Sequence, residues 1–172
     1  MTTIAIFSDT HSSHGHCLEG EALSAAREAD AVIHAGDFNS EAALEAFQSV
    51  NSSLYGVFGN TDSMSVRDRL PEARTVDHAG LRIAVTHRRD GGQTGLKMFG
   101  RSRDADIVVS GHTHRPTVID ADDCVLLNPG SHADPRGNRP GFAVLEDTGD
   151  SLAGEIREPE GTLIESFDIA LE

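Results

Sequence analysis

Short apolar segments recur along this chain, and each ends abruptly in a polar turn. The first segment, residues 4–7, has no polar alternation and is followed at once by Ser8, Asp9, Thr10 and His11. Such a run is typical of a parallel strand that is buried on both faces. Because alternate side chains of an extended segment point the same way, Asp9 and His11 can form a chelate beyond the end of the strand.

The Asp-x-His pattern alone also fits a turn in which Asp9 caps a helix that begins near Cys17. The later apolar segments favour the chelate, because each of them also leads into residues that can bind a metal. The segments AVIHA, SLYGVF, LRIAVT and DIVVS precede Gly36-Asp37, Gly59-Asn60, His87 and Gly111-His112-Thr113-His114.

The spacing of apolar residues predicts an α/β fold. We expect helices over residues 16–28 and 40–49, the second capped by Ser40, to alternate with strands at the amino end of the chain. This alternation predicts a parallel sheet with its ligand site at the carboxyl ends of the strands. Further on, we expect a hairpin turning at Ala79-Gly80, a helix over residues 94–101 and several short strands. The expected strands are residues 31–35, 53–58, 75–78, 81–86, 106–110, 117–119, 125–127, 141–146, 152–158 and 163–169.

The length of 172 residues, 38% of them hydrophobic, suits one domain over residues 1–172. Cys17 and Cys124 form no C-x-x-C pair, and we expect both to be small buried side chains. The first strand begins without a basic or apolar leader, and no apolar run approaches the length of a membrane span. A cytoplasmic location is therefore expected.

The formal charge is −14, with thirteen Arg residues and a single lysine, Lys97. This balance resembles that of proteins from salt-accumulating halophiles. An acidic tail is the alternative, but Glu19, Glu21, Asp30 and Glu41 place acids early in the chain as well. Such a charge argues against a stable nucleic-acid complex or an anionic membrane partner. We expect a small anionic substrate held by a local positive charge, and a homo-oligomer is compatible with the sequence.

A pair of divalent ions would supply that charge. Such a pair needs a bridging carboxylate together with imidazole and oxygen ligands. Asp37 is the natural bridge, with Asp9, His11 and one imidazole on one ion, and Asn60 with two imidazoles on the other. Two carboxylates and a bridging hydroxide leave a net charge of about +1, which suits a phosphodiester attacked by that hydroxide.

At this point the motifs resemble those of a known family. The series SDTH, HAGD, GNTD, VTH and GHTH, followed by NPGSHADPRG, resembles the calcineurin-like metallophosphoesterases, in particular their small single-domain archaeal and bacterial phosphodiesterases. The resemblance implies two mixed β-sheets packed as a sandwich with helices outside. It also implies a phosphodiester hydrolase with two divalent ions, Mn being expected first and Ni, Co, Fe or Zn accepted. The implied ligands are Asp9, His11, Asp37 and His114 for the first ion, and Asp37, Asn60, His87 and His112 for the second.

This chain departs from many relatives where they carry a histidine that protonates the leaving group. Thr61 follows Asn60, and Arg88 and Arg89 follow His87. The identity of a general acid is therefore open. His14 and His16 lie just after the first chelate and could reach the site, although an exposed loop is the simpler interpretation.

The remaining polar residues have structural interpretations. We expect His34 to be a hydrogen-bonded imidazole in the core and His78 to be exposed. The resemblance implies that the turn at residues 128–131, which precedes His132, lies beside the metals. Asn128 and Ser131 can serve simply to stabilise that turn. Contact of Arg136 with a substrate phosphate is left open.

A function of another class also fits the motifs. The small subunit of retromer resembles the same branch and acts as a scaffold, so this fold can serve as a non-catalytic interaction module. A metal-binding regulator is a third hypothesis for the function. Completeness of the ligand set favours the enzyme, because relatives that lose activity tend to lose the imidazoles.

Overall fold

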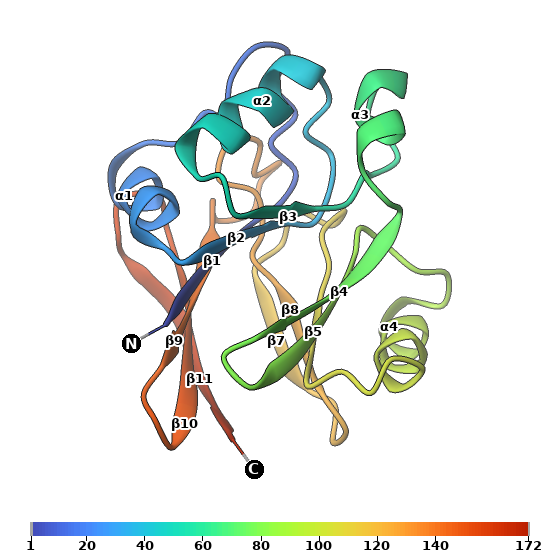
Figure 1. Ribbon diagram of the computed structural model, residues 1–172, viewed down its shortest axis with the longest axis vertical. Helices are drawn as coiled ribbons and strands as arrows, with labels where there is room; N and C mark the ends of the chain where they lie inside the picture. Colours follow the sequence, from blue (N-terminus) through green and yellow to red (C-terminus); the bar gives the residue numbers. More distant parts are fainter. Residues whose placement is uncertain (1, 172) are drawn as a thin grey trace.

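The computed structural model describes residues 2–171, which form two mixed β-sheets with helices outside them (Figure 1). The strands are β1 (Thr3–Phe7), β2 (Ala31–His34), β3 (Leu54–Gly56), β4 (Ala73–His78), β5 (Leu81–Thr86), β6 (Ile107–Val109), β7 (Thr117–Asp120), β8 (Val125–Asn128), β9 (Phe142–Asp147), β10 (Ser151–Arg157) and β11 (Leu163–Ala170). The helices are α1 (Gly20–Glu28), α2 (Glu41–Val50), α3 (Met64–Arg69) and α4 (Gly92–Arg101). The first sheet has the order β11-β10-β9-β1-β2-β3 and the second β4-β5-β6-β8-β7. The expected sandwich is confirmed.

Each sheet contains three adjacent parallel strands, at one side of the first sheet and in the middle of the second. In the first sheet β1 pairs with β2 and β2 with β3, all parallel, while β9 pairs antiparallel with β1. In the second sheet β5, β6 and β8 are parallel, and β4 and β7 are antiparallel edges. Helices α1 and α2 make the crossovers of the first sheet, and Ser40 caps α2 by accepting the Ala43 N–H at 3.1 Å. The predicted β-α-β-α-β order is therefore confirmed.

The main core lies between the two sheets. Ile6 and Ile33 of the first sheet and Ile83 and Ile107 of the second belong to one buried cluster. A second cluster packs α1 and α2 on the first sheet, and a third packs α4 on the second, around Phe99. Each buried side chain of this size contributes roughly 1.5–3 kcal/mol, so the clusters hold the strand ends in fixed positions. Within residues 2–171, no helix combines the length and apolarity that a bilayer span requires.

The β4–β5 hairpin turns at Ala79-Gly80, as predicted. Both residues have positive φ, 54° and 78°, which is the geometry of a tight two-residue hairpin turn. His78 pairs with Leu81 across this turn. Its side chain is partly buried rather than exposed, because residues at a strand end pack against neighbours on one face.

Three further local predictions are wrong. Helix α1 begins at Gly20 rather than near residue 16, because Cys17 and Gly20 have positive φ and interrupt a helical path. Cys17 is exposed on this irregular segment, whereas Cys124 is buried as expected. The stretch after Asn60 contains the short helix α3, which Ser63 caps by accepting the Val66 N–H. The sequence offered only a polar connection there, because six residues are too few to show a helical apolar stripe.

Candidate metal centre

The predicted ligands meet where the parallel strands of both sheets end. Asp9 and His11 follow β1, Asp37 follows β2, and Asn60 follows β3. From the second sheet, His87 directly follows β5, and the loop after β6 carries His112 and His114. Because the parallel strands of each sheet share one direction, the loops at their carboxyl ends gather at one edge of the sandwich. The structure thus brings together the seven predicted site residues, Asp9, His11, Asp37, Asn60, His87, His112 and His114.

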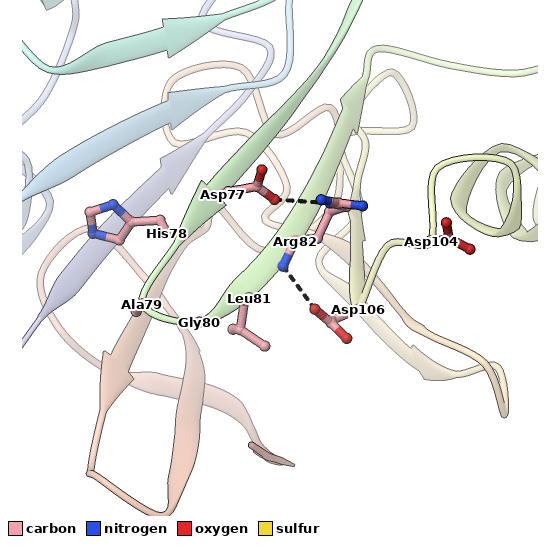
Figure 2. A pocket seen from close by; sticks show the side chains of 8 residues that line it. All are labelled: Asp77, His78, Ala79, Gly80, Leu81, Arg82, Asp104 and Asp106. Atoms are coloured by element: carbon pink, nitrogen blue, oxygen red, sulfur yellow. Dashed lines mark hydrogen bonds and ion pairs between the residues drawn. The ribbon is translucent and has the colours of Figure 1, made fainter. Parts of the chain in front are cut away.

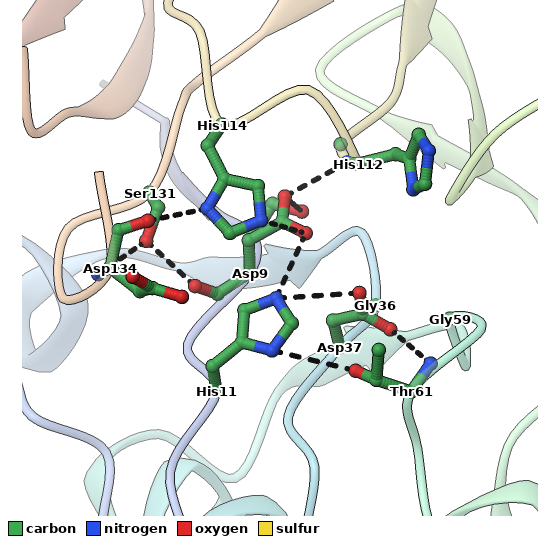
Figure 3. Close-up of polar contacts among 12 residues, drawn as sticks. Asp9, His11, Gly36, Asp37, Gly59, Thr61, His112, His114, Ser131 and Asp134 are labelled. Carbon is green, nitrogen blue, oxygen red and sulfur yellow. Dashed lines mark hydrogen bonds and ion pairs between the residues drawn. The ribbon is translucent and has the colours of Figure 1, made fainter. Parts of the chain in front are cut away.

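Asp9 holds one carboxylate oxygen fixed and leaves the other free. Its Oδ2 accepts hydrogen bonds from Ser8 Oγ at 2.8 Å and from the His112 backbone N–H at 2.9 Å. Its Oδ1 is buried without a hydrogen-bond partner. This oxygen lies 3.5 Å from His114 Nε2 and 3.7 Å from His11 Nε2 (Figure 3). A buried carboxylate oxygen that faces two ring nitrogens is suited to a shared cation.

Asp37 is anchored in the same way. The backbone N–H of Thr61 donates to its Oδ1 at 2.9 Å, and its Oδ2 lies 3.1 Å from His87 Nε2 and 3.4 Å from His11 Nε2. Burial would raise the pKa of Asp37, but the His87 imidazole and the Thr61 hydrogen bond outweigh burial and hold the pKa well below its usual range. Asp37 is therefore charged at neutral pH and central enough to serve two ions.

Backbone carbonyls set which ring nitrogens face the centre. His87 Nδ1 donates to the Ala35 carbonyl at 2.8 Å, and His114 Nδ1 donates to the Asp134 carbonyl. A carbonyl oxygen can only accept, so Nδ1 carries the proton and the neutral ring presents its Nε2 lone pair to the centre. This arrangement is the usual one for a metal-binding histidine.

Asn60 and His112 complete the side of the centre nearest to solvent. Asn60 Oδ1 lies 3.0 Å from His87 Nε2 and 3.1 Å from His112 Nδ1, and both Asn60 and His112 are exposed. With the His87 proton on Nδ1, an oxygen lone pair and a nitrogen lone pair face each other at that first distance. A cation between these atoms would satisfy both, so the donor set fits a second ion here as well.

The carboxylates change how the imidazoles titrate. The Asp9 carboxylate raises the pKa of His11, against the opposing effect of burial. Burial lowers the pKa of His87, but the Asp37 and Asp9 carboxylates outweigh it and the pKa is raised. The nitrogens that would bind a metal ion therefore also bind protons more readily. This is expected where several acceptor atoms lie close together, because a positive charge of either kind reduces their repulsion.

Five of these residues have a left-handed backbone conformation. The φ angles are 54° for Asp9, 47° for His11, 62° for Asp37, 74° for His112 and 60° for His114. Each such residue costs about 1 kcal/mol or more, and strained backbone of this kind concentrates at functional sites. The packed sheets hold the turns that direct the side chains inward.

The glycines before Asn60 and His112 are required by close packing. A Cβ atom at Gly59 would overlap the Asp37 carboxylate, and one at Gly111 would overlap Ser8 Oγ and the Asp9 carboxylate. The Gly-Asn and Gly-His motifs therefore have a physical basis. The glycine lets one ligand-bearing turn lie directly against the carboxylate of another.

One supporting residue was missed from the sequence. The buried carboxylate of Asp62 accepts backbone N–H bonds from Asp37 at 2.9 Å, Asn39 at 2.7 Å and Gly59 at 2.7 Å. Burial raises the pKa of Asp62 even though these three donors favour its charged form. Asp62 thereby joins the loops that carry Asp37 and Asn60. The available signal in the sequence was its position at the end of the GNTD motif, residues 59–62. Asp62 does not itself follow an apolar strand directly, so the rule that found the candidate ligands did not select it.

The other polar residues take mostly structural places. His34 is buried, contacts Thr10 Oγ1 at 2.8 Å through Nε2 and accepts the Gly36 N–H through Nδ1, as expected of a core imidazole. Ser131 Oγ donates to the Asp9 carbonyl at 2.7 Å, so the 128–131 turn does support the site. Its Asn128 donates to the Gly111 carbonyl at 3.0 Å.

His132 and His16 point into the aromatic core rather than into the metal centre. His132 Nε2 donates to the His16 carbonyl at 2.8 Å, and both rings pack on Phe47. His14 is exposed. Arg136 is also exposed, and its Nε donates to Asp134 Oδ2 at 3.0 Å.

Comparison with known proteins agrees with this geometry. Residues 2–150 match the model of the calcineurin-like phosphoesterase superfamily domain. The chain belongs to this superfamily. A probable metallophosphoesterase of Methanothermobacter thermautotrophicus is 32% identical to this chain over 157 residues, which are 89% of this chain and 90% of the relative. A phosphodiesterase of Methanocaldococcus jannaschii is 27% identical over 138 residues, 74% of this chain and 82% of the relative.

The fold recurs in solved structures. Vacuolar Protein Sorting 29 from Cryptosporidium parvum superposes with a TM-score of 0.84 at 19% sequence identity, covering 98% of both chains. At this level of identity the likeness shows a shared fold alone. The assignment to the phosphoesterases therefore rests on the family match and on the relatives. The fold itself is common to phosphoesterases and to Vacuolar Protein Sorting 29.

Proposed function

We propose that this phosphoesterase hydrolyses phosphodiesters with the help of two divalent ions. The supporting observation is the convergence of acceptor atoms at the strand ends, with Asp9 Oδ1 and His11 Nε2 buried and without hydrogen-bond partners. The phosphodiesterase among its relatives supports a diester substrate. The proposed ligands of the first ion are Asp9, His11, Asp37 and His114, and those of the second are Asp37, Asn60, His87 and His112.

When bound, the ions supply positive charge that polarises a phosphate and lowers the pKa of water to near neutrality. The chain's own residues keep that charge in place. Asp9 and Asp37 each have one oxygen tied by hydrogen bonds, so the other oxygen cannot rotate out of the centre. Two carboxylates against two divalent ions leave about +2 before water binds, enough to attract a singly charged diester.

The chain offers little help to the departing oxygen. Thr61 Oγ1 donates to Asn39 Oδ1 at 2.6 Å, and its backbone N–H donates to Asp37. Both protons of Thr61 are therefore engaged, and no imidazole stands at that position. In this proposal the leaving oxygen takes its proton from water, so diesters with good leaving groups are cleaved best.

We extend the proposal to the conditions in which the enzyme works. Manganese is the metal we expect first, because oxygen and imidazole ligands accept it and no thiolate takes part. The formal charge of −14 supports a small substrate, a cytoplasmic place in a salt-accumulating archaeon, and no stable nucleic-acid or membrane partner. A homo-oligomer is compatible with these properties.

Metal analysis combined with a substrate screen tests the function. Chelation should abolish hydrolysis of bis(p-nitrophenyl) phosphate, and Mn, Co or Ni should restore it. Asp37→Ala should lose both ions, while Asp77→Ala, at the distant β4–β5 hairpin, should keep them. Full activity of metal-free protein would refute the mechanism.

A non-catalytic interaction module is the second candidate, and the fold shared with Vacuolar Protein Sorting 29 supports it. The complete ligand set favours the enzyme. The same screen separates the two: bound metal without turnover of any mono- or diester would favour the module.

A further inference from the structure

A cavity opens beside the metal centre, on the side of His87 and His112. Its volume is about 470 Å³, within the range of small-molecule sites. Other parts of its lining come from the loop after β5, from α4, and from strands β7 and β8. Since two of the proposed metal ligands form part of its wall, a phosphate held at the centre would carry one of its substituents into this cavity.

The inner wall of the cavity is apolar. Leu96 of α4, Ile119 of β7 and Leu126 of β8 line it, and all three belong to the cluster around Phe99. A phosphate ion alone would gain no binding energy from this wall, because apolar surface contributes to binding only when an apolar group covers it. The wall therefore fits a ligand with a ring or hydrocarbon next to the phosphate.

The rim of the cavity is positively charged. Arg88, Arg89 and Arg115 line it, and none of its described lining residues is acidic, although the chain has 28 Asp and Glu residues against 14 Lys and Arg. Within residues 2–171, the exposed Arg115 guanidinium makes no ion pair, whereas Arg88 pairs with Asp90 at 3.5 Å and Arg89 lies 4.3 Å from the centroid of the Phe99 ring. The donors of Arg115 therefore suit a further anionic group.

A second cavity of similar size shows that this charge pattern is local. It lies at the β4–β5 hairpin, has a volume of about 510 Å³, and is lined by Asp77, Asp104 and Asp106 around Arg82 (Figure 2). Arg82 already donates to Asp77 at 2.9 Å. This second cavity would repel an anion, so the arginines beside the metal centre are not a general property of the surface.

We propose that the cavity beside the metal centre binds one alcohol substituent of the phosphodiester substrate, and that this substituent combines a flat apolar ring with a second anionic group. The proposal rests on the proposed phosphodiesterase function. The ring would cover Leu96, Ile119 and Leu126, and the second anion would pair with Arg115. A nucleotide bearing a further phosphate has this chemistry, and so does an aryl ester with an acidic substituent.

Direct binding to the manganese-loaded protein tests the cavity without requiring turnover. Calorimetry would compare ligands that share one phosphate group but differ in substituent: methyl phosphate, phenyl phosphate, thymidine 5′-phosphate and thymidine 3′,5′-bisphosphate. We expect each added element, ring and second phosphate, to tighten binding by about tenfold. Carboxyphenyl phosphate distinguishes an aryl acid from a nucleotide as the preferred source of the same chemistry.

Matched variants assign the gain to the cavity. Arg115→Gln should remove most of the tightening due to the second phosphate, and Ile119→Thr or Leu96→Gln most of that due to the ring. Arg82→Gln, in the acidic cavity, should change neither ratio. Because methyl phosphate reports the metal centre alone, its binding separates the two proposals: failure to bind it would count against the metal centre. Equal binding of all the phosphates, or an equal loss for methyl phosphate and bisphosphate in Arg115→Gln, would overturn the cavity proposal.

Discussion

Replacing Asp62 by Ala should loosen the metal centre although Asp62 is not one of the proposed ligands. The buried Asp62 carboxylate accepts N–H bonds from Asp37, Asn39 and Gly59 at 2.9, 2.7 and 2.7 Å. A buried donor that loses its acceptor costs about 1–3 kcal/mol. Three such donors, partly rehydrated in the space left behind, should cost about 3–6 kcal/mol, a large share of the roughly 5–15 kcal/mol that stabilises a typical domain.

Urea denaturation in the presence of a chelator measures this loss without a contribution from metal binding. At this chain length each kcal/mol shifts the melting temperature by about 2–4 °C, so a loss of about 3–6 kcal/mol should make Asp62→Ala melt about 6–24 °C lower. Asp62→Asn keeps one carbonyl acceptor and should lie between Asp62→Ala and the native protein. Asp68→Ala removes the same charge from an exposed position of α3 and should stay within about 0.5 kcal/mol of the native protein.

Metal affinity provides the second measurement. The Asp62 bonds hold the turn of Asp37 against the Gly59-Asn60 turn, so their loss should weaken manganese binding while leaving two ions per chain at saturation. Identical denaturation midpoints and metal affinities for Asp62→Ala and Asp68→Ala would show that these bonds do not position the loops.

Acid should destabilise the protein through His132, because burial lowers its pKa from 6.5 to about 4. The unfolded chain gains this proton below pH 6.5 and the folded chain does not, so about 2 kcal/mol is lost by pH 5, and His132→Gln should melt with a weaker pH dependence. The formal charge of −14 predicts a melting temperature that rises steeply from 0.1 to 1 M salt, as the screening length falls from about 10 to about 3 Å; a flat curve would mean locally paired acids. Hydrolysis should slow steeply as the leaving-group pKa rises, and Thr61→His should reduce this dependence. A shallow native dependence that steepens in His14→Ala would instead identify His14 as the acid.

The centre could be predicted because its residues follow a local rule. Asp9, Asp37 and His87 each stand within three residues of the end of a buried parallel strand. Parallel strands of one sheet end at the same edge, so a one-dimensional pattern implies proximity in space. How the second sheet faces the first is set by packing between Ile6, Ile33 and residues more than 40 positions away, and the resemblance to a family supplied that information.

The parts that were missed depend on contacts that no local rule signals. Asp62 acts through hydrogen bonds to backbone groups 3, 23 and 25 residues away. Because nearly every residue type has a backbone N–H, the sequence does not show which residues donate these bonds. Cys17 was expected to be buried from its residue type, but the turn around it is held by the contact between the His16 carbonyl and His132. The role of Asp62 and the exposure of Cys17 therefore depend on contacts between distant loops, which the spacing of apolar residues does not predict.

The position of the centre links metal binding to the stability of the whole sandwich. Asp9 and Asp37 follow strands of the first sheet, whereas His87 and His114 follow strands of the second, so their acceptor atoms meet where the sheets join. Without a positive charge between them these atoms repel one another, and the raised pKa values of His11 and His87 show that protons are attracted to relieve that repulsion. Cations do so more strongly, and they compete with protons for the same nitrogens. Acid should therefore release bound ions, and the melting temperature should fall further with decreasing pH in the presence of Mn²⁺ than in the presence of a chelator, because only the metal-bound protein exchanges cations for protons, which hold the sheets together less strongly.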